Sequence, residues 1–183
     1  MKKFIILLAV MTISLSASAQ LATDSFSEDR EREDGWLQQG YRGFLEIGMP
    51  CPVQCGRGEG VSIKTTHGYQ FSEWFFAGLG IGYTNFVHIE DYWDYDCYPK
   101  RDSFNAFGDF KLTIPTESRF YPYLEARFGI AVPAVYDGVF FFEVPVGCRV
   151  ALNDKLGINA GVSFQLYGWG NPLAVGPFVS FDF

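Results

Sequence analysis

The chain is 183 residues long, 48% hydrophobic and 18% aromatic, and its formal net charge is −7. This length predicts one domain, and the acidic balance excludes nucleic acid as an expected partner because phosphate binding requires a basic surface. Beyond the N-terminal segment, no stretch approaches 18 consecutive apolar residues, so we expect no transmembrane helix.

Residues 1–19 have the pattern of a signal peptide. Lys2 and Lys3 form a basic start, residues 4–13 are apolar, and residues 17–19 give an A-x-A cleavage site. An N-terminal membrane anchor is the alternative, but the apolar run is short for a hydrocarbon core of about 30 Å. We therefore expect an exported protein.

Residues 20–39 are acidic and polar. They lack apolar periodicity apart from Trp36 and Leu37, which predicts a flexible lead-in to the domain. A short helix is the alternative.

From residue 40 to residue 183, apolar side chains recur at every second position in eight short segments. A period of two is the signature of a β-strand, and segments of about ten residues can cross a membrane when tilted. The segments are 41–49, 61–66, 74–83, 104–112, 123–130, 141–150, 156–167 and 175–183. Pro177 predicts a bulge or an irregular start in the last segment, because proline lacks a ladder donor.

Residues that favour turns separate these segments. Short turns are predicted at 67–70, 115–119 and 153–154, and other connections at 50–59, 87–102, 133–138 and 168–172. Short turns that alternate with mostly longer loops are typical of a barrel with one periplasmic and one extracellular end.

Every charge within the segments lies on the face opposite the apolar one. The ten residues are Arg42, Glu46, Lys64, Asp109, Lys111, Glu125, Arg127, Glu143, Arg149 and Asp182. A soluble barrel with a lipid-binding cavity would show the reverse arrangement. A closed barrel in lipid gives the apolar face an apolar environment and satisfies every backbone amide. The pattern therefore predicts an all-β fold, an eight-stranded antiparallel up-and-down transmembrane β-barrel.

Eight strands enclose an interior only wide enough for side chains. We therefore expect ion pairs and aromatic side chains to plug the lumen, with a proton or ion pathway as the alternative. On the third segment, Trp74 and Phe76 should face this interior. Gly78, Gly80 and Gly82 should make room for large neighbours across the lumen.

Three motifs resemble those of the OmpA/OmpX-like small eight-stranded outer-membrane β-barrels. They are FAGLGIGY at 76–83, PYLEARFG at 122–129 and the terminal VSFDF, whose Val179, Phe181 and Phe183 are similar to the signal read by the barrel-assembly machinery. The resemblance implies the outer membrane of a Gram-negative cell envelope, with outer-membrane lipid and the assembly machinery as partners. Members serve as envelope-stabilising proteins, adhesins or receptors.

Four cysteines are present, and an oxidising compartment permits disulfides. One candidate is a disulfide between Cys51 and Cys55 within a single loop, and the other is a disulfide from one of them to Cys97. We expect Cys148 to be a free, lipid-facing residue. No matching Cys/His pair follows the CPVQC spacing, so zinc is not expected.

The connection at 87–102 is the best candidate for recognition. It concentrates carboxylates and aromatic residues, which suit calcium, sugars or a protein, whereas the simpler interpretation is an acidic loop with aromatics at the headgroup level. The candidates are Asp91, Tyr92, Trp93, Asp94, Tyr95, Asp96 and Tyr98. We expect these residues to contact a ligand or a protein outside the cell.

No catalytic constellation is evident, and we expect neither an enzyme nor a cofactor. A lipid A hydrolase would need His, Ser and Glu to converge, whereas His67 falls at a predicted turn and His88 has no serine close in sequence. We therefore expect a structural or interaction barrel. The alternatives are a lipid A-modifying hydrolase or acyltransferase of the outer membrane and a soluble periplasmic lipid-binding barrel.

Overall fold

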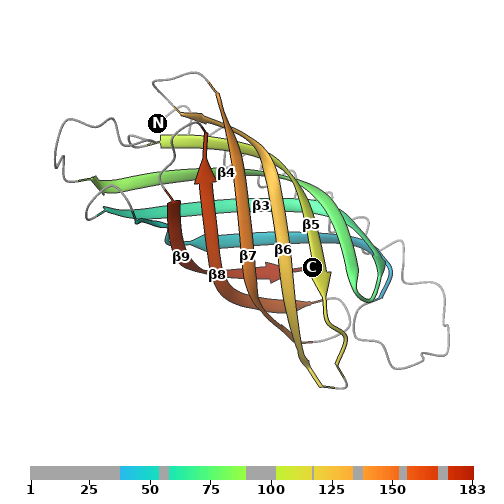
Figure 1. Cartoon of the computed structure of the whole chain (residues 1–183). Coiled ribbons are helices and arrows are strands. Elements are labelled where there is room, and N and C mark those ends of the chain that lie inside the picture. Colours follow the sequence, from blue (N-terminus) through green and yellow to red (C-terminus); the bar gives the residue numbers. More distant parts are fainter. Residues whose placement is uncertain are drawn as a thin grey trace. The chain divides into compact units, whose positions relative to one another are not determined.

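The computed structural model describes residues 38–53, 58–89, 102–116, 118–133, 138–152, 156–168 and 173–183. These residues form one antiparallel sheet (Figure 1). Its strands are β1 (Gly40–Gly48), β2 (Cys51–Pro52), β3 (Gly58–Ser72), β4 (Phe75–Ile89), β5 (Asp102–Thr113), β6 (Phe120–Pro133), β7 (Val139–Ala151), β8 (Gly157–Tyr167) and β9 (Leu173–Asp182).

The sheet closes on itself. Each long strand pairs with the next, and β1 also pairs with β9, from Phe44 opposite Asp182 to Gly48 opposite Phe178. The result is a closed, up-and-down barrel of eight long strands, as predicted. In the part of the chain that the structure describes, no helix is long and apolar enough to cross a membrane.

The two faces of the strands follow the alternation of the sequence. Along β5, inward residues are buried and the residues between them are exposed or half-buried. Large apolar side chains point outward from all eight long strands, and Leu79 is the most exposed of them, at 74%. A pleated strand sends successive side chains to opposite faces. The polar and charged residues that alternate with the apolar ones in the sequence therefore lie inside the barrel.

The turn predicted at 67–70 is wrong. β3 runs on to Ser72, and the chain turns at Glu73 and Trp74 instead. Gly68 is required by a close approach of two strands, because a Cβ there would lie 2.3 Å from the carbonyl oxygen of Ala77. Trp74 consequently lies in the turn, 56% exposed, and not on the inner face.

Pro177 does not disturb the ladder between β8 and β9, whose register is continuous. Its carbonyl accepts a hydrogen bond of 2.9 Å from the Met49 amide, so its missing N–H faces β1. The irregularity therefore falls on that side, where β1 ends at Gly48 and β2 begins at Cys51. The connection predicted at 50–59 thus contains a short strand.

Two interior glycines make room for neighbours on adjacent strands and not, as predicted, across the lumen. A Cβ on Gly80 would lie 2.4 Å from the ring of Phe107, and a Cβ on Gly82 would lie 2.7 Å from Cγ of Lys64. Phe107 and Lys64 are the residues with which these glycines pair in the sheet.

Candidate functional site: the charged interior

All ten charged residues of the predicted network lie inside the barrel and are buried. They come from β1, β3, β5, β6, β7 and β9, whereas the interior faces of β4 and β8 carry glycines, aromatic residues and uncharged polar residues. Five positive and five negative side chains balance one another. The structure thus brings residues up to 140 positions apart in sequence into direct contact.

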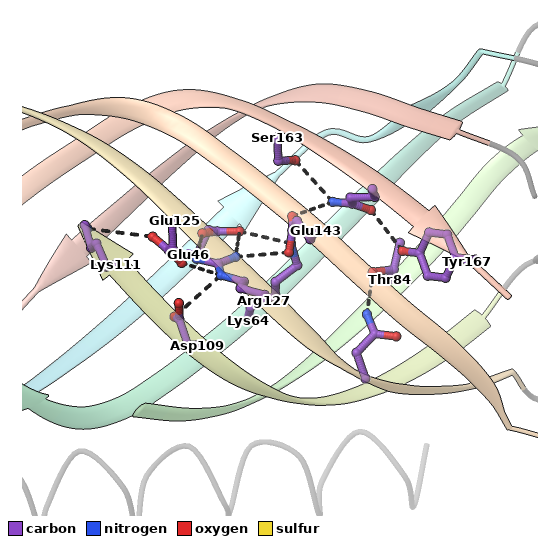
Figure 2. A network of polar contacts seen from close by, with 12 residues as sticks. Glu46, Lys64, Thr84, Asp109, Lys111, Glu125, Arg127, Glu143, Ser163 and Tyr167 are labelled. Carbon is purple, nitrogen blue, oxygen red and sulfur yellow. Dashed lines mark hydrogen bonds and ion pairs between the residues drawn. The ribbon is translucent and has the colours of Figure 1, made fainter. Parts of the chain in front are cut away.

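Arg127 is the centre of the larger group (Figure 2). Its two terminal nitrogens bind both carboxylate oxygens of Glu46, at 2.7 and 3.0 Å. Nη1 also contacts Glu143 at 3.2 Å, while Nε contacts Asp109 at 3.5 Å and donates to Glu125. A guanidinium can serve several carboxylates because its five donors lie in a fixed planar fork.

Two lysines complete this group. Lys64 Nζ lies 3.1 Å from Glu46 and 2.5 Å from Glu143, so it closes a ring with Arg127 around the same two carboxylates. Lys111 Nζ lies 3.9 Å from Glu125. The group contains Glu46, Lys64, Asp109, Lys111, Glu125, Arg127 and Glu143, and we call it the central cluster.

A second group lies nearer the end of the barrel where β1 begins and β9 ends. Arg42 Nη1 and Arg149 Nε both contact Oδ2 of Asp182, at 3.0 and 2.8 Å. We call these three residues the arginine cluster. Asn159 links it to the central cluster, since its amide donates to Asp182 Oδ1 at 3.3 Å and its oxygen accepts from Lys111 at 2.9 Å.

Aromatic rings fill the space around these charges. The Lys111 ammonium lies 4.5 Å from the ring centroid of Phe44 and 3.8 Å from that of Tyr123, and Arg127 lies over Phe107 at 5.5 Å. Such contacts between cations and ring faces are favourable in a desolvated setting. The rings therefore stabilise the cations as well as occupying volume.

Uncharged polar residues extend the network toward the opposite end. Gln165 donates to Glu143 at 2.8 Å and accepts from the Tyr167 hydroxyl at 2.9 Å. Tyr167 packs with Phe107, Phe141 and Ala131 in a buried cluster. Figure 2 shows this chain of contacts from Lys111 to Tyr167. Asn159 and Gln165 are network members that the charge pattern does not identify, although their inward positions in the sequence alternation could have identified them.

The arrangement of the ten buried charges suits mutual neutralisation of opposite charges. An unpaired buried charge is strongly destabilising, and a pair needs its remaining donors and acceptors satisfied. Among the buried residues of the described interior there is no cysteine and no histidine. Among the described residues, no group of three or more potential ligands could hold a metal ion.

His67 lies mid-strand on the outer face and not in a turn. Its Nδ1 is 2.5 Å from the Tyr41 hydroxyl, and its Nε2 is 3.1 Å from the Thr65 hydroxyl. Its ring also contacts Phe183 edge-on. This cluster was not predicted, because the turn wrongly predicted at 67–70 removed His67 from the strand face that it shares with Thr65. The side chain of His88 is outside the described residues.

The other predicted site residues belong to the loops, the cysteines and the terminal motif. The loop residues Asp91, Tyr92, Trp93, Asp94, Tyr95, Asp96 and Tyr98, and also Cys55 and Cys97, lie outside the described residues. Cys51 is exposed and has a free thiol. Its pairing with Cys55 or Cys97 stays a prediction, because both of those residues lie outside the described part of the chain. Cys148 has a free thiol and is half-buried on the outer face. Val179 and Phe181 of the terminal motif are exposed on β9.

Solved structures of other proteins share this fold. Neisserial surface protein A (NspA) is 13% identical with a TM-score of 0.54, and the match covers 78% of this chain and 93% of that chain. The outer membrane enzyme PagL is 12% identical with a TM-score of 0.53, and the match covers 76% and 97%. No protein-family model and no curated protein matches the sequence. The chain thus has the fold of the small eight-stranded outer-membrane barrels, and the resemblance to OmpA/OmpX-like barrels is confirmed at that level.

Proposed function

We propose that this chain is an outer-membrane β-barrel protein with a plugged lumen, which serves a structural or interaction role through its loops. Residues 1–19 would be the signal peptide that directs export. The observation that carries the proposal is the inverted distribution of polarity, apolar outside and charged inside, around the whole barrel.

The apolar side chains of the outer face support the proposal that the barrel is surrounded by lipid. One exposed apolar residue from each long strand shows that the apolar surface runs around the barrel: Ile47, Val61, Leu79, Phe104, Leu124, Val146, Phe164 and Phe181. Among the described residues of this face, the charged ones, Glu59 and Asp102, lie at strand ends. In water such a surface would be a strong aggregation hazard, whereas in a bilayer each side chain meets hydrocarbon.

Aromatic residues gather where the membrane boundary is expected. Around the turn between β3 and β4, Tyr69 contacts Phe71 at 5.2 Å between ring centroids, and Phe75 contacts Phe71 at 5.8 Å and Trp74 at 5.7 Å. Transmembrane barrels carry aromatic girdles at both interfaces because these rings suit the headgroup level. This cluster fits the girdle of the turn end.

The buried side chains of the interior support the proposal that the lumen is plugged. Ten buried charges, the rings of Phe44, Phe76, Phe107 and Phe141, and the polar chain to Tyr167 occupy the lumen. Because removal of one partner would leave others uncompensated, the network resists rearrangement. We therefore propose that the barrel does not conduct ions, and that specific activity resides in the loops, chiefly the loop between the end of β4 at Ile89 and the start of β5 at Asp102.

Membrane fractionation tests the location. The mature protein should be recovered with outer membranes and should migrate differently on gels before and after boiling, because a closed barrel resists detergent until heated. Recovery in the soluble periplasmic fraction would overturn the proposal and favour a periplasmic barrel. A steady large conductance in planar bilayers would refute the plug.

An enzymatic role is the second candidate. The fold is shared with PagL, described as an outer membrane enzyme, but the outward His67 has Tyr41 and Thr65 as its hydrogen-bond partners and no carboxylate among the described contacts. We propose a non-enzymatic role. Mass spectrometry of lipid A from cells with and without the protein would detect a modified species if this is wrong.

A further inference from the structure

Asp109 is the least compensated carboxylate of the central cluster. It is 2% exposed, and among the described residues no donor reaches its Oδ1. Its Oδ2 lies 3.5 Å from Nε of Arg127, the same nitrogen that donates to Glu125. Both oxygens of Glu46, in contrast, are bound by Arg127, at 2.7 and 3.0 Å. An ionised carboxylate that is buried with so few donors is costly.

A second carboxylate lies beside Asp109. Asp109 on β5 pairs with Arg127 on β6, and Glu125 precedes Arg127 by two residues, so the two carboxylates are diagonal neighbours on the inner face. Their side chains lie within hydrogen-bonding reach of each other, and Figure 2 shows both beside Arg127. Two ionised carboxylates only accept hydrogen bonds, whereas a protonated one carries an O–H that can donate to its neighbour.

The charges of the central cluster point to the same conclusion. Its seven residues comprise three cations and four carboxylates, so full ionisation would leave one negative charge in excess. One proton on a carboxylate makes this cluster neutral. The contact of the central cluster with the arginine cluster runs through the uncharged amide of Asn159.

The groups around the two carboxylates leave Asp109 without an ammonium partner. Lys64 Nζ is bound by Glu46 and Glu143. Lys111 Nζ is bound by the Asn159 oxygen at 2.9 Å, and neither lysine forms an ion pair with Asp109. The inward residues of β4 from Phe76 to Phe86 carry no ionisable group. The charged and titratable groups that face the pair are Lys111 on β5, Tyr123 and Arg127 on β6, Glu143 on β7, Glu46 on β1 and Lys64 on β3.

We propose that Asp109 and Glu125 form a proton-binding site inside the barrel, in which Asp109 is protonated at neutral pH and donates its O–H to the Glu125 carboxylate. The proton is taken from solvent as the chain folds, and the O–H bond is the one covalent bond that forms. An aspartate of the unfolded chain releases its proton above about pH 4. Unfolding therefore releases a proton, and the stability of the barrel falls as the pH rises. The site lies in the lumen and does not depend on the proposed role of the loops.

Infrared spectroscopy of the folded barrel in detergent tests for the proton directly. Ordinary carboxyl groups are ionised at neutral pH, so the C=O stretch of a protonated carboxylic acid reports a buried acid. This band should be present in the folded wild type and absent after heating has unfolded it, a comparison that needs no variant. The band should also be absent from Asp109→Asn. A folded wild type without the band, or a band that persists in Asp109→Asn, would overturn the proposal.

Urea unfolding at a series of pH values tests the effect of the proton on stability. Relative to Asp109→Asn, the unfolding equilibrium constant of the wild type should rise by up to about tenfold for each pH unit above about pH 4, because one proton is released for each molecule that unfolds. Asparagine does not ionise, so the comparison isolates position 109. A ratio that does not change with pH would contradict the proposal.

Glu46→Gln is the matched control at neutral pH. It also removes one carboxylate from the central cluster without changing the size of the side chain, but it deprives Arg127 and Lys64 of a bound partner. Glu46→Gln should lower the unfolding midpoint, whereas Asp109→Asn should leave it unchanged or raise it. Equal losses in the two variants would show that Asp109 is ionised in the folded barrel.

Discussion

Phe183 and Gly43 hold the two ends of the barrel sequence together. The amide of each residue donates to the carbonyl of the other, at 2.8 and 2.9 Å, and the Phe183 ring lies 2.5 Å from the position that a Cβ of residue 43 would occupy. The terminal aromatic therefore extends the seam between β1 and β9 and covers the glycine beside it.

Deletion of Phe183 should impair formation of the barrel. The change removes both hydrogen bonds and the ring that covers Gly43, at the seam where closure occurs. The fraction of heat-modifiable protein in outer membranes would be measured. Phe140→Ala, which truncates an exposed aromatic of β7, is the control and should leave that fraction almost unchanged. An equal yield for the deletion and the wild type would contradict a role of this residue in assembly.

Arg127→Glu should destabilise the barrel by about 3–5 kcal/mol, the cost of breaking a buried ion pair. It would place a fifth carboxylate among Glu46, Glu143, Asp109 and Glu125. Arg119→Glu, at an exposed position, should cost about 1 kcal/mol or less. Urea unfolding of both variants gives the comparison, and equal midpoints would show that the interior network contributes no more than a surface charge.

Leu79→Arg should destabilise the protein in lipid vesicles by about 2–4 kcal/mol if this exposed side chain faces the centre of the bilayer. Leu152→Arg, beside the turn that follows β7, should cost about 1 kcal/mol or less because the cost falls near the interface. Urea unfolding from vesicles measures both. If the two changes cost the same, the assignment of depth along the strands is wrong.

Gly80→Ala should destabilise the barrel by about 1–3 kcal/mol through overpacking, because its Cβ would collide with the buried ring of Phe107. Gly108→Ala is the matched control on the outer face. There the nearest side-chain atoms, from Phe110 and Phe128, are 3.7 Å away, so the change should be tolerated. A stable Gly80→Ala barrel would mean that the Phe107 ring can move aside.

Replacement of residues 91–98 by a Gly/Ser linker should leave the heat-modifiable barrel intact and abolish any binding that a screen detects. Strand residues are committed to lipid or to the lumen, so loops can vary toward a partner at the least cost to the fold. The replacement of residues 134–137 serves as the control. Binding that survives the first replacement but is lost in a variant of the outer face would place recognition on the barrel wall.

The sequence predicted the faces of the strands and the membership of the charged network. A period of two fixes which side chains share a face, and a charge on the lipid side would be expensive, so Arg127 and Glu46 could be placed inside without a structure. Their bidentate contact could not be predicted. It depends on how far each strand is staggered around the closed barrel, and alternation alone does not define that stagger.

Gly68 shows why one turn was misplaced. Glycine occurs both in turns and where two backbones approach closely, and the sequence does not distinguish these uses. Only the pairing of β3 with β4 shows that Gly68 opposes Gly78 within a continuous ladder. The strand β2 was not predicted for a different reason: its two residues are too few to show an alternation of apolar and polar side chains.

The seam between β1 and β9 has a consequence for the rate of folding. It joins Phe44 to Asp182 and neighbouring pairs, contacts that require almost the whole domain to be looped back on itself. Contacts between such distant residues form slowly, since the entropy of loop closure is lost before they form. Until the seam forms, both edge strands expose unpaired amides. The unfolded chain should therefore be long-lived and prone to aggregation, and it should need protection by a chaperone on its way to the membrane.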